Sequence, residues 1–262
     1  MLGDNATGLV IGNIGNTELQ WETTNRLTAG LQGNFFNNRL SVRANFFKSW
    51  TDNLLSLSRL AWTSGLEENW GNGGKLENMG FDVTASVKAV NLKNFRWEVG
   101  ASVGHYKNEV TALPNNNRPV ETDIYGATVL TQVGQPVGVF YGWDSDGVYA
   151  TSAEAAAEGK YLVSGNGDHI NFGAGDMRFK DVDNNHVIDN ADRVVIGDPN
   201  PDLFGNIFTT LNWKNLTLSA AFNYSLGNDI YNYQRSLLEG GSLFLNQTTA
   251  MSRRWTTEGQ HT

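Results

Sequence analysis

Six long stretches of alternating apolar and polar residues constrain the fold of this chain more than any other feature of its sequence. In residues 95–106 the alternation is clearest, because every second residue from Phe95 to Val103 is apolar and the residues between are polar or small. Such alternation predicts β-strands with one apolar and one polar face. Most of the stretches exceed the roughly 5 to 6 residues of an average soluble strand. The six expected strands are 21–35, 40–46, 81–89, 95–106, 204–213 and 216–224.

The connections between the expected strands alternate in length. Short turns at residues 37–38, 91–94 and 214–215 join the strands in pairs, whereas about twenty residues (53–74) and about ninety residues (111–202) separate the pairs. All short turns therefore fall at one end of the sheet and all long loops at the other. Barrels of the bacterial outer membrane have this asymmetry, with short periplasmic turns and long extracellular loops.

We therefore expect an all-β fold: a portion of an antiparallel up-and-down transmembrane β-barrel with long extracellular loops. A strand needs about 9 to 11 residues to cross a bilayer at a tilt. The apolar residues of 95–103 are expected on the convex, lipid-facing side. The alternative is a soluble β-sandwich, in which such apolar faces pack together. Aromatic residues near the segment ends fit the girdles at the two membrane surfaces; they are Trp21, Phe35, Phe36, Trp50, Phe95, Trp97, Tyr106, Phe204, Trp213 and Tyr224.

Six strands are too few to close a barrel. Bacterial single-chain barrels have at least about eight strands, and an open strand edge in lipid leaves backbone groups without hydrogen bonds. We therefore expect residues 1–262 to be a partial barrel whose missing strands lie elsewhere.

Charge and composition exclude several classes of protein. The chain has 27 acidic and 19 basic residues, a net charge of −8, and no basic stripe that would neutralise phosphates, so nucleic acid is not an expected partner. It has no cysteine, which excludes thiolate metal sites and thiol nucleophiles. Any metal must therefore be bound by oxygen or histidine.

The expected long loop, residues 111–202, contains two local signals. Thr151, Glu154 and Gly159 predict a short helix with a capping box and a glycine stop. Residues 181–192 have the spacing of a twelve-residue EF-type calcium loop, in which hard oxygens surround one cation. The expected ligands, at positions 1, 3, 5, 7, 9 and 12, are Asp181, Asp183, Asn185, the Val187 carbonyl, Asp189 and Asp192.

Two residues of this loop depart from the EF-type pattern. His186 occupies position 6, where glycine normally permits a positive φ. Asp192 replaces the usual glutamate at position 12 and has a shorter reach. The alternative interpretation is a solvated acidic turn without a metal. We expect a bound Ca²⁺, because four carboxylates close together repel one another unless a divalent cation offsets their charge.

Several sequence motifs occur in a characteristic order. Residues 15–24 contain an N-x-x-L-x-W-E stretch, and residues 73–81 contain G-x-x-x-N-x-G before Phe81. The most specific begins at residues 175–181, continues through the acidic loop to Asp192-Arg193, and ends at 196–201 with Gly197 and Pro-Asn-Pro. Together they resemble the C-terminal barrel portion of SusC/RagA-type TonB-dependent outer-membrane transporters. His186 stands where that family usually has glycine.

The resemblance implies a location, a function and a set of partners. It implies a bacterial outer-membrane importer of glycans or other oligomeric nutrients, such as peptides, which is not an enzyme. The implied partners are a SusD-like lipoprotein on the outside, the TonB complex, the transported oligosaccharide or peptide, and outer-membrane lipid. The N-terminal plug and the segment that contacts TonB are absent from this chain, so it would supply only barrel wall and external loops.

The second hypothesis is a secreted, calcium-stabilised all-β polysaccharide-binding module or glycoside hydrolase. A glycoside hydrolase needs two facing carboxylates, for which Glu67, Glu68, Glu77 and Glu98 are available. No nucleophile motif is present, and the four histidines lack metal-ligand spacing. Arg43, Lys88, Arg96 and Glu98 are expected on the polar face of the barrel wall. Aromatic residues of the loops that are available to contact substrate or a partner are Trp62, Trp70, Tyr125, Tyr141, Trp143, Tyr149, Tyr231 and Tyr233.

Overall fold

A computed structural model describes residues 15–60, 63, 65, 68–241 and 244–261. The chain divides into two compact units. The sheet unit comprises Met1–Val120, Thr131–Val137 and Asn200–Gly227, and the insert unit comprises Glu121–Leu130, Gly138–Pro199 and Asn228–Thr262. Each unit has its own architecture.

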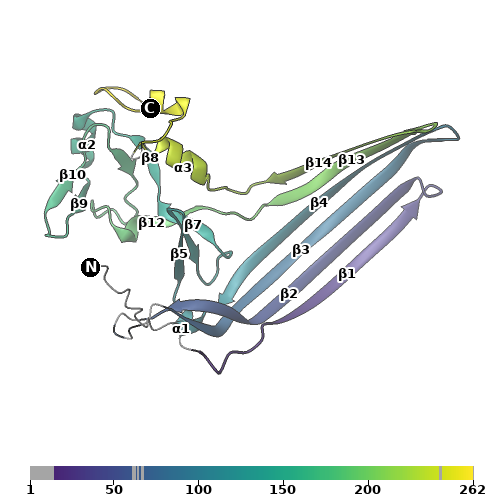
Figure 1. Ribbon diagram of the computed structural model, residues 1–262, viewed down its shortest axis with the longest axis horizontal. Coiled ribbons are helices and arrows are strands. Elements are labelled where there is room, and N and C mark those ends of the chain that lie inside the picture. Colours follow the sequence, from purple (N-terminus) through teal and green to yellow (C-terminus); the bar gives the residue numbers. More distant parts are fainter. Residues whose placement is uncertain (1–14, 61–62, 64, 66–67, 242–243, 262) are drawn as a thin grey trace, which may run out of the picture. The chain divides into compact units, whose positions relative to one another are not determined.

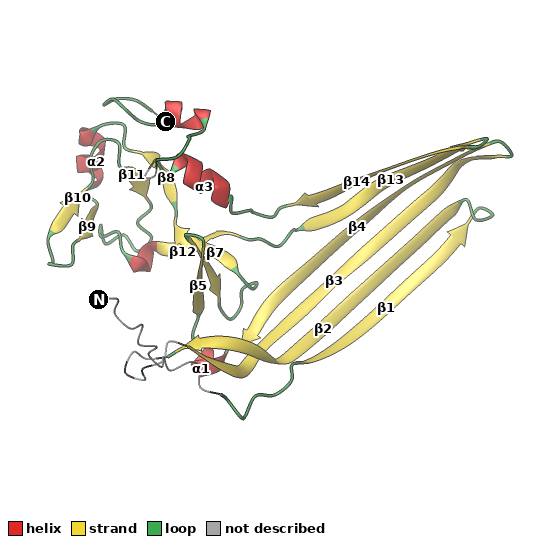
Figure 2. Ribbon diagram, viewed as in Figure 1, coloured by secondary structure: helices red, strands yellow, loops and turns green. Residues whose placement is uncertain are grey.

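The sheet unit is one six-stranded antiparallel sheet (Figures 1 and 2). Its strand order, β1-β2-β3-β4-β13-β14, follows the sequence, so the expected up-and-down order is confirmed. The β-sandwich alternative is wrong for these segments, because all six lie in a single sheet. The strands are β1 Thr23–Phe35, β2 Leu40–Arg59, β3 Glu68–Leu92, β4 Phe95–Ala112, β13 Leu203–Trp213 and β14 Leu216–Leu226.

The loop expected at residues 53–74 is largely strand, which corrects the sequence prediction. Asn53 has a φ of 58° and lies at a register shift between Thr51 and Leu54. Beyond this bulge the ladder resumes and continues to the pair Arg59–Glu68. At the bulge the alternation on β2 changes phase, because Leu54 and Leu55 are adjacent, and residues 68–75 on β3 contain one large apolar residue, Trp70. Pattern alone therefore places the strand ends too early. The short turns are residues 36–39, 93–94 and 214–215.

Cross-strand register aligns the apolar residues of neighbouring strands into rows. Phe35 faces Leu40, which faces Val87, and Val87 in turn faces Val99. These apolar residues are exposed: Leu31 is 83% and Phe222 is 71% exposed. Among the buried hydrophobic residues of the described chain, only Val110 belongs to the six-stranded sheet. The sheet is therefore a wall with one apolar and one polar face, and it does not enclose a core.

The polar face carries phenylalanine rings where the opposite strand has glycine. Phe47 pairs with Gly80, Phe208 with Gly100, and Phe204 with Gly104. A Cβ on Gly104 would lie 2.8 Å from Phe204 Cζ, and one on Gly80 would lie 2.9 Å from Phe47 Cζ. The missing side chains thus make room for rings that lie across the glycines, a known way to compensate strand glycines.

This arrangement corrects part of the expected aromatic girdle. Phe204 shares the polar face with Tyr106, and their rings make an edge contact with centroids 5.8 Å apart. By strand alternation, Trp50, Trp97 and Trp213 lie on the apolar face. Arg43, Lys88, Arg96 and Glu98 lie on the polar face, as expected from the same alternation.

The insert unit shows that the expected ninety-residue loop is a folded unit with its own sheets. A four-stranded sheet has the order β12-β7-β6-β5, and two smaller sheets pair β8 with β11 and β9 with β10. Its buried hydrophobic residues are Leu130, Val139, Tyr149, Ala150, Ala155 and Ile188. The strands are β5 Val120–Ile124, β6 Ala127–Thr131, β7 Val139–Trp143, β8 Ser145–Val148, β9 Tyr161–Val163, β10 His169–Asn171, β11 Met177–Phe179 and β12 Arg193–Gly197.

The helices are short. Helix α2, Ser152–Glu158, confirms the expected helix: the Thr151 hydroxyl accepts from Glu154 N, and Gly159 ends the helix at a φ of 64°. In the described residues, none of the helices has both the length and the apolar character needed to span a membrane. The others are α1 Pro114–Asn117, α3 Tyr233–Glu239, and the 3₁₀ turns η2 Asn190–Asp192 and η3 Thr249–Arg253.

Candidate functional site

The acidic loop of residues 181–192 brings three of its carboxylates together. One oxygen each of Asp181, Asp183 and Asp192 lies within 4.8 Å of the others. Calcium binds oxygen at about 2.3 to 2.6 Å, so two ligands on opposite sides of one ion are up to about 5 Å apart. The spacing of these oxygens therefore fits a single Ca²⁺.

The backbone of the loop adopts the turn that position 6 requires. His186 has a φ of 65°, the left-handed conformation that glycine would adopt there. A non-glycine residue in this conformation costs about 1 to 2 kcal/mol. Asp181 helps to hold the turn, because its carboxylate accepts from the backbone amides of His186 (2.9 Å) and Asn185 (3.2 Å). Burial works to raise the pKa of Asp181, but these amides and that of Asn184 lower it below its ordinary value.

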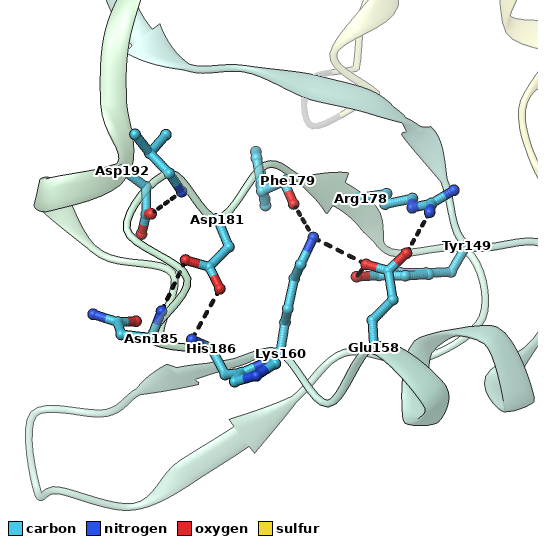
Figure 3. A network of polar contacts seen from close by, with 10 residues as sticks. Tyr149, Glu158, Lys160, Arg178, Phe179, Asp181, Asn185, His186 and Asp192 are labelled. Carbon is cyan, nitrogen blue, oxygen red and sulfur yellow. Dashed lines mark hydrogen bonds and ion pairs between the residues drawn. The ribbon is translucent and has the colours of Figure 1, made fainter.

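The buried side chain of Asp192 connects the two ends of the loop through hydrogen bonds. It is 1% exposed, and its two carboxylate oxygens accept from Val182 N at 2.7 Å and from Asp189 N at 2.9 Å. Figure 3 shows the first of these bonds, together with the contacts of Asp181. A buried carboxylate that accepts two backbone hydrogen bonds remains able to accept further contacts, because each oxygen has two lone pairs.

The other expected ligands have local partners. Asp189 lies outside the cluster of three carboxylates; its side chain accepts from Ala191 N at 2.6 Å and caps η2. The Asn185 amide donates to Asp183 Oδ2 at 2.9 Å, and its oxygen accepts from Val187 N at 2.6 Å. The structure thus gathers three expected carboxylates and places the fourth in a helix cap.

The second half of the loop is fixed to β9. Ile188 is buried and its amide donates to Tyr161 O at 2.9 Å, while Tyr161 N donates to His186 O at 3.0 Å. Tyr161 also stacks on His169, with ring centroids 3.9 Å apart. The apolar pair Val187-Ile188 therefore anchors the loop, chiefly through the buried Ile188.

A partly buried network that the sequence did not reveal holds the strand that leads into the loop. Glu158, the last residue of α2, accepts from Tyr149 at 2.9 Å and forms ion pairs with Lys160, also at 2.9 Å, and with Arg178 (Figure 3). Lys160 donates in addition to Phe179 O at 2.8 Å, two residues before Asp181. Lys160 thus links the network to the start of the acidic loop.

Electrostatics in this network follow from burial and pairing. Burial, followed by the neighbouring Glu158, raises the pKa of Tyr149 to about 12. Burial also works to raise the pKa of Glu158, but hydrogen bonds from Lys160, Tyr149 and Arg178 lower it overall. Glu158 is therefore held as a carboxylate, and Tyr149 as a neutral donor to it.

Arg193 and Gly197 have structural roles. The Arg193 guanidinium lies over the rings of Tyr141 and Trp143, 4.3 and 5.4 Å from their centroids, and pairs with Glu121 at 2.8 Å. A Cβ on Gly197 would lie 2.9 Å from Asp229 Oδ2, the oxygen that accepts from Asp198 N. Both motif residues stabilise the insert unit around the acidic loop.

The remaining candidates do not form a catalytic pair in the described part of the chain. Glu77 pairs with Lys48, and Glu98 faces Lys88 across the sheet. Glu67, the side chain of Glu68, and Trp62 lie outside the described residues. Among the loop aromatics, Tyr149 is buried. Those with large exposed fractions are Tyr125 at 73%, Trp70 at 46%, Trp143 at 43% and Tyr233 at 41%.

Comparison with known proteins decides the family. The family model described as TonB dependent receptor-like, beta-barrel, matches residues 2–194. The chain belongs to this family. It is 31% identical over 268 residues to TonB-dependent receptor P3 of Formosa agariphila, a match that covers 100% of this chain and 26% of that protein. It is 25% identical to TonB-dependent receptor SusC of Bacteroides thetaiotaomicron, covering 82% of this chain and 20% of SusC.

Solved structures show the same fold. A structure of the RagAB peptide transporter matches with a TM-score of 0.72 and 24% sequence identity, covering 99% of this chain and 27% of that chain. A second, of the RagAB peptide importer in its open-open state, matches with a TM-score of 0.69. The chain spans about a quarter of the length of the relatives that it matches. The resemblance to SusC/RagA-type receptors is confirmed, and the protein is assigned to the bacterial outer membrane.

Proposed function

We propose that the chain is part of a TonB-dependent outer-membrane importer of glycans or other oligomeric nutrients, of the SusC/RagA type. The observation that carries this proposal is the six-stranded sheet with apolar rows on one face and polar residues on the other. An exposed apolar face of this extent is unfavourable in water and favourable against lipid. The polar face then lines the interior, and cargo crosses without chemical change.

The proposal places further strands beside the described sheet. β1 and β14 are its outermost strands, and each presents an unpaired edge in the part of the chain that is described. In a bilayer every unpaired backbone group costs several kcal/mol, so a membrane sheet must close on itself. The remaining strands, the plug and the segment that contacts the TonB complex would come from the rest of the protein.

We further propose that the insert unit faces the cell exterior and contacts a SusD-like lipoprotein. The support is the arrangement of the connections: the turns at residues 36–39, 93–94 and 214–215 share one end of the sheet, and the insert leaves from the other end. The relatives are TonB-dependent receptors, and one matched structure is that of the RagAB peptide transporter. Both oligosaccharide and peptide therefore remain cargo hypotheses.

Uptake by a deletion strain tests the import proposal. The gene for the full-length protein is deleted and restored in the source bacterium, and uptake of labelled oligosaccharide pools and labelled peptide pools is measured. Loss of one of the two activities, restored by the gene and dependent on TonB, is expected and identifies the cargo class. Unchanged uptake of both pools would contradict the proposal.

Protease cleavage of residues 138–199 on intact cells tests the proposed orientation of the insert unit. Cleavage on intact cells is expected, because a segment that the protease reaches only after the membrane is broken would face inward.

The acidic loop is proposed to hold one Ca²⁺. Asp181, Asp183 and Asp192 would supply carboxylate oxygens, supplemented by the Asn185 side chain and the Val187 carbonyl, while Asp189 would keep its capping role. The support is the mutual spacing of the three carboxylates and the left-handed turn at His186. A bound cation would offset the repulsion of the three carboxylates and order the loop.

A further inference from the structure

A pocket in the insert unit has a mostly apolar wall. Its volume is about 380 Å³, at the lower end of the roughly 300 to 1,000 Å³ of ligand pockets. Of its eleven lining residues, six have pure hydrocarbon side chains and three are tyrosines, and all eleven belong to the insert unit. The pocket is called the tyrosine pocket below, and its wall includes Ile124, Tyr125, Phe140, Ile230, Tyr231 and Tyr233.

Two of the tyrosine rings are held in place by the backbone. Tyr125 and Gly126 form the two-residue turn between β5 and β6, with φ values of 50° and 87°. The Tyr231 hydroxyl donates to Tyr125 O at 3.1 Å and so stabilises this turn. Tyr233 is the first residue of α3, which Asn232 caps, and the centroid of its ring lies 5.0 Å from that of Tyr125. Both rings are therefore positioned before a ligand binds.

Folding stability does not account for the side chain of Tyr125. A two-residue hairpin turn with positive φ usually has asparagine or glycine at this position, because a larger side chain is strained there. Tyr125 is nevertheless 73% exposed, and Ile230 in the same wall is 81% exposed. Both lie in the unit that elsewhere buries apolar residues such as Val139 and Ile188. Exposed apolar groups and a strained backbone are features of binding sites.

Two polar side chains of the wall are already bonded within the protein. The Tyr231 hydroxyl bonds to Tyr125 O and, at 3.0 Å, to the Ser236 hydroxyl. The Asp229 carboxylate accepts from Asp198 N at 2.9 Å. A sugar ring buried in this pocket would leave hydroxyl groups without partners, which is unfavourable. An aliphatic or aromatic side chain needs only apolar contact area, so the wall favours such a side chain over a saccharide.

Size and charge indicate which kind of molecule carries this side chain. Each partner of a stable protein complex buries about 800 Å², whereas a sphere with the volume of this pocket has a wall of roughly 250 Å². The pocket is therefore too small to be a protein interface by itself. The insert unit has 16 acidic and seven basic residues, and Asp229 lies in the wall of the pocket. An acidic surface attracts cations and repels anions, so a short peptide without net negative charge fits best.

We propose that the tyrosine pocket binds one aliphatic or aromatic side chain of an oligopeptide cargo that is neutral or positively charged. The inference rests on the proposed import function and narrows its cargo class to peptide. The bound side chain packs against the Tyr125 ring and Ile230, while the backbone of the peptide stays outside the pocket in water.

Peptide binding to the purified full-length protein tests the proposal. Synthetic hexapeptides of glycine, serine and lysine, with leucine, phenylalanine or serine at one central position, are titrated by calorimetry. The wild type is expected to bind the leucine and phenylalanine peptides at least about tenfold more tightly than the serine peptide, because of the apolar area that they bury. In Tyr125→Asn with Ile230→Ser, this preference should fall to about twofold or less. Asparagine suits the left-handed turn, so the variant should keep its fold.

The insert unit contains a matched control. Ile170, on β10, is likewise exposed and does not line the pocket, and Ile170→Ser should leave the preference for leucine unchanged. Replacing the lysines of the leucine peptide by glutamate should weaken its binding to the wild type, with a larger effect at low salt.

Three results would overturn the proposal. The first is equal binding of the leucine and serine peptides by the wild type, which does not depend on how any variant folds. The second is an unchanged preference in Tyr125→Asn with Ile230→Ser; if this variant also lost a co-purifying lipoprotein, the pocket would be part of a protein interface. The third is displacement of the leucine peptide by a neutral oligosaccharide pool.

Failure of this inference can be distinguished from failure of the import proposal. If TonB-dependent uptake persists while the leucine and serine peptides bind equally, only the inference fails. If the leucine peptide binds through the tyrosine pocket but deletion of the gene leaves uptake unchanged, the pocket remains a peptide site and the import proposal fails.

Discussion

The sheet unit and the insert unit use apolar residues in opposite ways. In the sheet unit they are arranged in rows on an exposed face, with Phe222 71% and Leu27 61% exposed. In the insert unit several are buried, among them Tyr149, Val139 and Ile188, all less than 5% exposed. The first arrangement suits a chain whose surroundings are lipid, and the second suits one whose surroundings are water. Apolar side chains are therefore exposed on a face of one unit of this chain and buried in the other unit.

This difference determines which substitutions destabilise each unit. The sheet unit has a ladder of backbone hydrogen bonds and depends on lipid and on neighbouring strands for the rest of its stability. The insert unit depends on its core and on charged networks such as that of Glu158. Substitutions in the sheet unit should therefore change its stability in lipid, whereas substitutions in the insert unit should act through its core and its charged networks.

A charge on the apolar face should break the sheet unit and have the largest effect. Phe222→Arg places a guanidinium against lipid and is expected to cost about 2 to 4 kcal/mol near the bilayer midplane. The neighbouring Asn223→Arg points to the opposite, polar face and is the matched control, with an expected cost near zero. Urea unfolding of the full-length protein in lipid vesicles measures both. Equal losses would show that the two faces do not have different surroundings.

Loss of the partly buried Glu158 carboxylate should affect the insert unit alone. Glu158→Gln leaves Lys160 and Arg178 without their shared partner and is expected to cost about 1 to 3 kcal/mol of local stability. Hydrogen exchange in residues 144–180 of the full-length protein measures this. Asp146→Asn, which removes an exposed carboxylate 3.7 Å from Lys180, is the control and should have little effect. Faster exchange in β2 and β3 would contradict the independence of the two units.

A fall in pH should reproduce part of the local destabilisation expected for Glu158→Gln. Because the folded state lowers the pKa of Glu158 below its ordinary value of 4.5, its contribution is fully present above that value. It is lost as pH falls through the folded-state pKa. Hydrogen exchange in residues 144–180, measured as a function of pH, should therefore show a step towards faster exchange in the wild type. This step should be absent in Glu158→Gln.

A calcium titration sharpens the description of the acidic loop, because two neighbouring aspartates have different roles. Asp183→Asn removes a carboxylate of the cluster and is expected to weaken Ca²⁺ binding at least about tenfold. Asp189→Asn changes the cap of η2 and should leave Ca²⁺ affinity nearly unchanged. Calorimetry and proteolysis of the loop, with and without Ca²⁺, measure both. Identical heats for wild type and Asp183→Asn would mean that the carboxylates form only a solvated turn.

The smallest expected effect concerns a single side-chain hydrogen bond in the sheet unit. The Trp97 indole donates to the Thr209 hydroxyl at 2.9 Å across β4 and β13. Trp97→Phe keeps a ring and loses this bond, at an expected cost of about 1 kcal/mol in vesicles. Thr209→Val removes the same bond together with the one that the Thr209 hydroxyl donates to Glu98 O at 3.3 Å, so the double variant should be little worse than Thr209→Val alone. Fully additive losses would contradict a direct interaction.

The sequence predicted the parts of the structure that depend on neighbouring residues. Period-2 alternation identified all six strands of the sheet, and Thr151 with Gly159 correctly bounded α2. The continuation of β2 and β3 past Asn53 was missed because the alternation changes phase at the adjacent Leu54 and Leu55, and because residues 68–75 on β3 contain one large apolar residue, Trp70. The short strands of the insert unit were missed because their pairing joins residues far apart, as when Arg193 faces Trp143.

The acidic loop shows how one motif can satisfy two requirements. Asp189 was predicted as a ligand from its position, but Asp189-Asn-Ala-Asp192 also has the form of a capping box, and that is the role the structure gives it. The Glu158 network could not be read from sequence, because Tyr149, Lys160 and Arg178 converge only after α2 and β11 are packed. Local patterns therefore predicted which residues belong to the site, and packing decided how they are used.

The pairs of glycine and phenylalanine on the polar face limit how this wall can diverge. A side chain at Gly100 would overlap the Phe208 ring, so the glycine cannot change while the ring stays. If Phe208 first becomes a small residue, Gly100 is then free to gain a methyl group. The same order applies to Phe204 with Gly104. Gly80 differs, because a Cβ there would also meet the backbone oxygen of His105, so this glycine is fixed even without the Phe47 ring. The first two pairs thus admit mutational paths in one direction only, and mutations at these paired positions should appear together in laboratory selections for a wider or narrower interior.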